Sequence, residues 1–118
     1  MISNRHRFHG YRALGLVYRF GSTARGPLFG LRVRKNERRR SYRAAVVVGR
    51  KINKSSVVRN RIRRRLYEGL RSLEPKINPG YDIVINVYSD TVRDLPHPQL
   101  LGQLKKQLEE AGVINHQK

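Results

Sequence analysis

The residues with the clearest chemistry are the basic side chains between Arg50 and Arg65. Eight of these sixteen residues are lysine or arginine, and none is acidic. Such a run is costly on a helix, because cations one turn apart repel one another and cations near the helix start oppose its dipole. A polyanionic partner would offset this cost. Arginine outnumbers lysine 19 to 7 in the chain, and its planar guanidinium suits phosphate and stacks on bases, so nucleic acid is favoured over an anionic membrane.

The acids and histidines show no arrangement that is typical of an enzyme or a metal site. The eight acids are scattered, whereas a nuclease that acts alone usually gathers carboxylates around Mg²⁺. His6 and His9 share a spacing of three residues, but they lack further ligands and are expected at the surface rather than on a metal. We therefore predict no catalytic residue and no metal held by the protein.

The charge of the chain is unevenly distributed. Residues 1–65 hold 20 lysines and arginines against one acid, Glu37, whereas residues 66–118 hold 6 bases and 7 acids. This gradient predicts one strongly positive face. The length predicts a single domain over residues 1–118, with an ordered core at about 5–112. The lack of cysteine and of a long apolar run predicts a cytoplasmic protein without a membrane partner, and an arginine-rich transit peptide is the less favoured alternative.

Three segments have the apolar period of a helix. The first covers residues 9–20 and ends at Gly21, in the position of a C-terminal cap. The second covers about residues 55–72 and begins with Ser55 or Ser56 as its cap. The third begins with His97 as its cap. The inward-facing residues of the second and third helices are predicted to be Val58, Ile62, Leu66, Leu70, Leu73, Leu100, Leu104, Leu108 and Ala111.

Four segments have the pattern of a strand, at residues 21–26, 28–35, 42–49 and 81–88. In the second segment apolar residues alternate with glycine and arginine, so one sheet face is predicted to be core and the opposite face basic. The continuous apolar run at 42–49 predicts a central strand with both faces covered. The order of elements is α-β-β-β-α-β-α, which predicts an α+β domain with a four-stranded sheet packed by helices.

The basic run forms the first candidate surface for nucleic acid. With its apolar stripe turned inward, the second helix places Asn60 and Arg64 on its far side and Arg61 and Arg65 on a flank, while Arg59 must extend past the stripe. Arginine and asparagine on one exposed face can contact phosphates and bases. The candidate residues of this surface are Arg50, Lys51, Lys54, Arg59, Asn60, Arg61, Arg63, Arg64 and Arg65.

The first helix and the basic side of the sheet form a second candidate surface. Tyrosines on the helix and arginines beside them can face Gly30 and Arg32. Aromatic walls over a basic floor suit single-stranded nucleic acid, because bases stack while cations follow the backbone. The alternative is that the tyrosines only pack. The candidate residues are Tyr11, Arg12, Leu14, Tyr18, Gly30 and Arg32.

The stretch GRKINKSSVVRNRIRRRLYE closely resembles the signature of the bacterial ribonuclease P protein component family, in which an RNR-containing helix follows a strand and a basic loop. The resemblance covers about residues 5–110. The helix that ends at Gly21, the strand LFGLRVR, and GYDIVINV after a Pro/Gly break also fall in the family's order.

This resemblance implies a left-handed crossover through the RNR helix, against the usual hand. It also implies a protein subunit that binds a catalytic RNA and the 5′ leader of precursor tRNA and assists Mg²⁺-dependent removal of that leader. The chemistry and the Mg²⁺ would belong to the RNA. By position, the residues at the catalytic RNA would be Arg59, Asn60, Arg61, Arg64 and Arg65, and those of the leader groove would be Leu14, Tyr18, Gly30 and Arg32.

The sequence departs from the family pattern at three places. Leu14 stands where an aromatic residue is usual, Arg32 where tyrosine is common, and Tyr88-Ser89 where a basic pair often occurs. The leader groove is therefore expected to rely more on charge than on stacking. Two alternatives are weighed against this family. A ribosomal or other structural RNA-binding protein would have much the same composition. A nucleoid-type DNA binder is less favoured, because the chain lacks an evident dimerisation segment or minor-groove arm.

Overall fold

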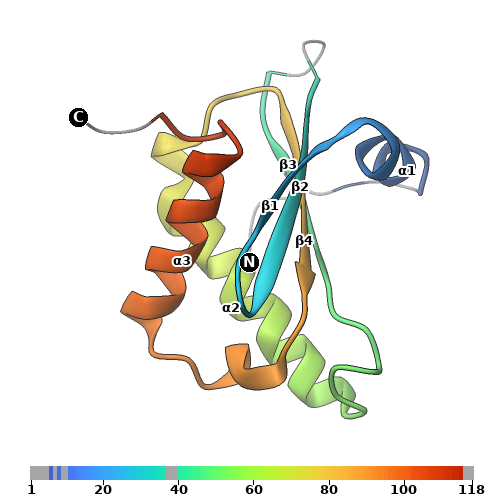
Figure 1. Cartoon of the computed structure of the whole chain (residues 1–118), viewed down its shortest axis with the longest axis vertical. Coiled ribbons are helices and arrows are strands. Elements are labelled where there is room, and N and C mark those ends of the chain that lie inside the picture. Colours follow the sequence, from blue (N-terminus) through green and yellow to red (C-terminus); the bar gives the residue numbers. More distant parts are fainter. Residues whose placement is uncertain (1–5, 7, 9–10, 37–39, 116–118) are drawn as a thin grey trace.

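Helices lie on both sides of a four-stranded sheet in the computed structural model (Figure 1). It describes residues 6, 8, 11–36 and 40–115, and the side chains of 11–13 lie outside this description. The predicted α-β-β-β-α-β-α order is confirmed. The elements are α1 (Tyr11–Phe20), β1 (Ser22–Arg25), β2 (Phe29–Lys35), β3 (Arg43–Val47), α2 (Ser56–Leu73), the 3₁₀ turn η2 (Glu74–Lys76), β4 (Tyr81–Val87), the 3₁₀ turn η3 (Asp90–Arg93) and α3 (His97–Glu110).

The strands are ordered β1-β2-β4-β3 across the sheet. The β1/β2 and β2/β4 pairs are antiparallel, and β3 and β4 are parallel. Because α2 lies between β3 and β4 in the chain, it forms the crossover that parallel strands require. The left hand of this crossover stays a prediction.

The prediction of a central strand with both faces covered at residues 42–49 is wrong, because β3 lies at the edge of the sheet. Its inward residues Ala44 and Val46 are buried, but Val47 on the opposite side is 41% exposed. Alanine and valine on the uncovered side made the run look apolar on both faces. The interior strands are β2 and β4, and Ile83, Val84 and Ile85 of β4 are fully buried.

The main core lies between the sheet and the pair α2 and α3, which cover the same face (Figure 1). It is built from the predicted stripes, and its largest fully buried side chains are Phe29, Leu31, Ile62, Leu66, Leu70, Ile83, Ile85, Leu100, Leu104 and Leu108. Helix α1 lies on the other side of the sheet (Figure 1). We call this other side the outer sheet face. Val17 of α1 and Val84 of β4 are fully buried but do not belong to the main cluster.

The helix ends follow local chemistry. Ser55 caps α2, as predicted, and its hydroxyl oxygen accepts a hydrogen bond from the Val58 N–H at 3.3 Å. Gly21 follows α1 and does not have a positive φ. Glycine is required here because a side chain would not fit. A Cβ there would collide with the carbonyl oxygen of Val17 and lie 2.8 Å from that of Val33. The cap of α3 is Pro96 rather than His97.

The prediction of a surface position for His6 is wrong. Its ring is 7% exposed and stacks on the Tyr42 ring with a centroid distance of 4.1 Å. Its Nδ1 donates to the Tyr42 carbonyl at 2.9 Å, and the Tyr42 hydroxyl donates to Glu74 at 2.5 Å. His9 lies outside the described residues. His6 therefore packs against Tyr42 rather than lying at the surface.

Candidate nucleic-acid interface

The basic loop before α2 is held in place by the helix itself. The Arg59 guanidinium donates to the carbonyls of Asn53 at 3.0 Å and Lys54 at 2.9 Å. The Asn53 side chain accepts from the Ser55 N–H at 2.9 Å and donates to Asp90 at 3.1 Å. Arg59 therefore holds the loop that carries Lys51 and Lys54 in position, and its extension past the apolar stripe stays a prediction.

Most of the candidate residues around the start of α2 are open to solvent. We call the exposed set the α2 basic surface; its members are Arg50, Lys51, Lys54, Asn60, Arg61 and Arg64. One acid approaches this surface, because Oδ1 of Asp94 lies 3.8 Å from Nη2 of Arg61. Both side chains are more than half exposed. An ion pair of this kind contributes little, about 0–1 kcal/mol. The surface therefore keeps most of its positive charge for a partner.

Arg63 and Arg65 are only partly exposed, and like Arg59 they make hydrogen bonds within the protein. The Arg65 guanidinium donates to the carbonyls of Val92 at 2.6 Å, Arg93 at 3.0 Å and Leu95. Arg63 donates to the Asn60 side chain at 2.5 Å. Arg65 therefore ties α2 to η3, and RNA binding by Arg65 stays a prediction.

We expect Arg65→Leu to lower the free energy of unfolding by about 1.5–3 kcal/mol, because it removes charge-assisted hydrogen bonds to three backbone carbonyls. Arg64→Leu is the matched control, because Arg64 is exposed on the same helix, and we expect it to change stability by less than about 0.5 kcal/mol. Urea denaturation followed by circular dichroism measures both. Equal losses in the two variants would show that the contacts with η3 contribute no stability.

The outer sheet face brings Tyr18 and Arg32 together. The Arg32 guanidinium donates to the Tyr18 carbonyl at 2.9 Å, and its Cζ lies 5.5 Å from the centre of the Tyr18 ring. The Tyr18 hydroxyl donates to Asn86 of β4 at 2.8 Å. Tyr18 as a whole stays 41% exposed, so its side chain is held at the hydroxyl end by Asn86 and remains accessible to solvent. Leu14, on the same helix, is half-buried.

Tyr88 and Gly30 complete this face. Gly30 is paired with Asn86 in the sheet. A Cβ at Gly30 would collide with the Tyr88 hydroxyl and lie 3.1 Å from the Ala24 carbonyl oxygen. Glycine therefore lets the Tyr88 side chain cross the strand, while Tyr88 remains 47% exposed. The set Tyr18, Arg32, Asn86 and Tyr88 is called the aromatic platform below.

Sequence reasoning missed Asn86 as a site residue and named Tyr88 only as a departure from the family. The available signal was the alternation along β4, which puts Asp82, Val84 and Asn86 on one side. Tyr11 and Arg12 belong to α1, but their side chains lie outside the described part of the structure.

No metal-binding cluster is found in the described part of the chain, where no three of its His, Asp and Glu side chains come together. The buried acid Asp82 is bound by Arg43. No helix among the described residues is both long and apolar enough to cross a membrane. Fold and surfaces together define a class of small basic α+β proteins, with exposed cations around the start of α2 and exposed tyrosines on the outer sheet face.

Comparison with known proteins identifies the family. A family model described as Ribonuclease P matches residues 2–112, so the chain belongs to the ribonuclease P protein family. The Ribonuclease P protein component of Symbiobacterium thermophilum is 31% identical over 112 residues, which cover 95% of this chain and 96% of the relative. That of Roseiflexus castenholzii is 40% identical over 77 residues, and the match spans 62% of its length and 65% of this chain.

Solved structures show the same fold. The RNase P protein from Staphylococcus aureus superimposes with a TM-score of 0.81 at 22% identity, covering 93% of this chain and 98% of the other. The RNase P protein from Thermotoga maritima gives a TM-score of 0.76 at 25% identity, covering 88% and 96%. The α+β fold predicted from the sequence is confirmed.

Proposed function

We propose that this protein is the protein subunit of a ribonuclease P, which removes the 5′ leader from precursor tRNA in the bacterial cytoplasm. The observation that carries this proposal is the family match over residues 2–112. The α2 basic surface supports it, because several exposed cations lie around one helix start with one exposed acid, Asp94, near Arg61. Counterion release from RNA would make such a surface bind strongly at low salt.

In this proposal the two surfaces bind two different RNA molecules, the catalytic RNA and the precursor tRNA. The α2 basic surface binds phosphates of the folded catalytic RNA. The aromatic platform binds the single-stranded leader, because Tyr18 and Tyr88 offer exposed rings and Arg32 a cation beside them. Base stacking on aromatic side chains tolerates different sequences, as a leader-binding site requires.

The chemistry of this reaction is assigned to the RNA partner and its Mg²⁺. In this proposal the protein holds no catalytic metal; among the described residues no group of three His, Asp or Glu side chains comes together. The protein would therefore contribute binding: it would neutralise phosphates and hold the leader in place.

Cleavage of precursor tRNA by a bacterial ribonuclease P RNA tests this function. At physiological Mg²⁺ the RNA should cleave at the mature 5′ end faster when the protein is present, and the protein alone should not cleave. A structural RNA-binding protein or a DNA binder would give no stimulation. Site-specific, metal-dependent cleavage by RNA-free protein would instead show that the catalysis is wrongly assigned.

Tyr18→Ala should weaken binding of precursor tRNA to the assembled enzyme by about 1–3 kcal/mol, because one stacked base loses its platform. Mature tRNA has no leader and should bind as before. Filter binding with both tRNAs measures the difference, in a calcium buffer that slows cleavage.

Tyr18→Phe is the matched control, because it keeps the ring and removes only the hydroxyl that donates to Asn86. We expect it to retain most of the affinity for precursor tRNA. If Tyr18→Ala weakens both tRNAs equally, or neither, the ring only packs and the leader assignment is wrong.

A further inference from the structure

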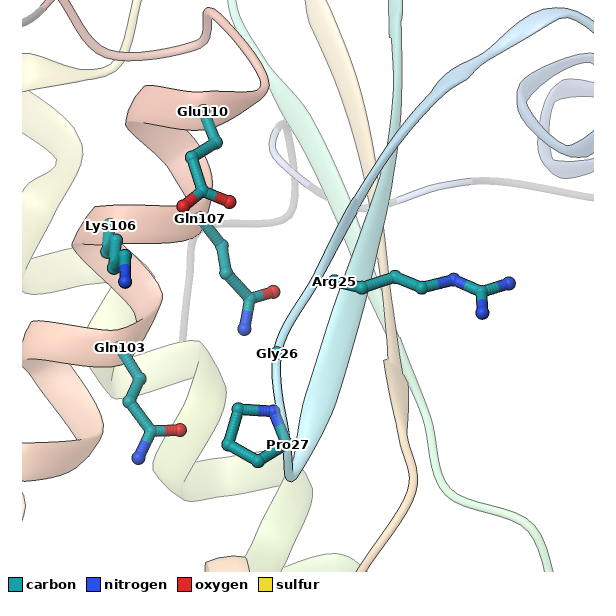
Figure 2. A pocket seen from close by; sticks show the side chains of 7 residues that line it. All are labelled: Arg25, Gly26, Pro27, Gln103, Lys106, Gln107 and Glu110. Carbon is teal, nitrogen blue, oxygen red and sulfur yellow. The ribbon is translucent and has the colours of Figure 1, made fainter.

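A pocket of about 300 Å³ lies between the β1–β2 turn and α3 (Figure 2), and none of its lining residues belongs to the surfaces assigned above. Gly26 and Pro27 of the turn form one wall. The other wall is one face of α3, whose lining residues Gln103, Lys106, Gln107 and Glu110 follow the helical spacing of three and four residues. Its volume is at the lower end of the range for small-ligand sites, about 300–1,000 Å³.

Gln107 is the most constrained of these side chains. It is 3% exposed, and its Nε2 donates to the Phe29 carbonyl at 2.9 Å. Gly26 makes this position possible, since a Cβ there would collide with Nε2. The bond to Phe29 fixes which end of the amide is nitrogen, because a carbonyl oxygen in its place could not donate. The Oε1 atom of Gln107 is therefore left for another partner.

Two amide oxygens at this pocket lack a donor. The Oε1 atoms of Gln103 and Gln107 are buried and accept no hydrogen bond from any residue that the structure describes. Both side chains extend from α3 toward the β1–β2 turn, while the Arg25 side chain extends away from α3 (Figure 2). A buried acceptor without a donor is costly, so these oxygens favour a ligand that donates hydrogen bonds.

The lining restricts the chemistry of that ligand. The two glutamine oxygens can accept from two N–H donors of a ligand. Lys106 can donate to a ring nitrogen. The Pro27 ring is an apolar surface against which a flat group can pack. Lys106 and Glu110 both line the pocket and their opposite charges offset each other, so the lining does not favour a charged ligand. An exocyclic amino group beside a ring nitrogen meets these conditions, as in cytosine and adenine. Uracil and hypoxanthine place a carbonyl at the same position, which would face the glutamine oxygens.

We propose that this pocket binds a nucleobase that carries an exocyclic amino group. The base can be a free nucleoside or an unpaired residue of an RNA, and both present the same donor and acceptor groups. Recognition here rests on the pocket alone and does not depend on assembly with a catalytic RNA.

Nuclear magnetic resonance of the full ¹⁵N-labelled chain tests the proposal with matched probes. Uridine differs from cytidine, and inosine from adenosine, in one respect. A carbonyl beside a protonated ring nitrogen replaces the amino group beside an unprotonated one. Cytidine and adenosine should shift the side-chain amide signals of Gln103 and Gln107, and uridine and inosine should not. No shift with any nucleoside, or equal shifts within a pair, would overturn the proposal.

Gln103→Leu should weaken cytidine binding about tenfold, because one hydrogen bond is lost. Gln99→Leu is the control, since Gln99 is exposed on the same helix and does not line the pocket. If Gln103→Leu fails to fold, Gly26→Ala, whose Cβ displaces the Gln107 amide, should weaken cytidine binding instead. Unchanged binding in the folded variant would overturn the site.

Short oligonucleotides separate the two sources of the base. If the pocket takes an unpaired RNA base, six-residue cytidine oligomers should bind more tightly than uridine oligomers, and Gln103→Leu should abolish this preference. The other outcome is that free cytidine binds while the oligomers show no preference for cytidine over uridine that depends on Gln103. In that case the pocket binds free nucleosides, and binding of an unpaired RNA base is excluded.

Discussion

Arg43→Met is expected to lower the free energy of unfolding by about 3–5 kcal/mol, because it leaves a buried carboxylate without its cation. The Asp82 side chain is fully buried and that of Arg43 is 13% exposed. The guanidinium binds both carboxylate oxygens, with Nε at 2.9 Å and Nη2 at 2.8 Å. The two residues are partners in the parallel register of β3 and β4. Since small domains are stable by only about 5–15 kcal/mol, this loss would leave the variant marginal.

The double variant Arg43→Met with Asp82→Leu is the control for this prediction. Removing both charges relieves the unpaired carboxylate, and replacing a buried ion pair by apolar groups is often nearly neutral. We therefore expect the double variant to be more stable than Arg43→Met alone. Urea denaturation of the three proteins gives the comparison. A loss below about 1 kcal/mol in the single variant would contradict the role assigned to the pair.

Replacing Lys54, Arg61 and Arg64 together by alanine should weaken assembly with the catalytic RNA about 100- to 500-fold at 0.1 M monovalent salt. This follows if each cation neutralises one phosphate, because the slope of log K against log salt then falls by about 0.7–0.9 per contact. The deficit should shrink toward 1 M salt, where counterion release contributes little. Titration of labelled RNA at several salt concentrations measures both the affinity and the slope.

The control removes the same number of charges from elsewhere in the fold. Arg71 lies at the end of α2, Lys76 in η2 and Lys105 on α3. Their triple alanine variant has the same net charge as the first, so we expect it to lose much less affinity and to keep the slope. If both triple variants weaken assembly equally, binding reflects net charge and the α2 basic surface is not the contact.

The sequence by itself determined the elements and their faces. The apolar residues of α2 and α3 recur every three or four positions, and those of β2 every second position, so the buried sides follow from backbone geometry alone. The cationic character of the α2 start also follows, because eight basic residues without an acid cannot be hidden in a core of this size. The predicted stripes were confirmed for this reason.

The position of β3 needed the tertiary structure. Its outward residues Ala45 and Val47 are small and apolar, and a sequence pattern cannot tell whether another strand lies beside them. In the fold β4 enters between β2 and β3, although it follows both in the chain. Strand order depends on which connection packs over the sheet, and local periodicity carries no information on it.

The roles of individual polar residues were also decided only by the tertiary structure. Arg64 and Arg65 are neighbours of the same type, but Arg64 is exposed while Arg65 binds carbonyls 27 to 30 residues further along the chain. Tyr18 likewise donates to Asn86, 68 residues away. A side chain's face is set by its own helix or strand, whereas its hydrogen-bond partner is set by a distant segment that packing brings to that face.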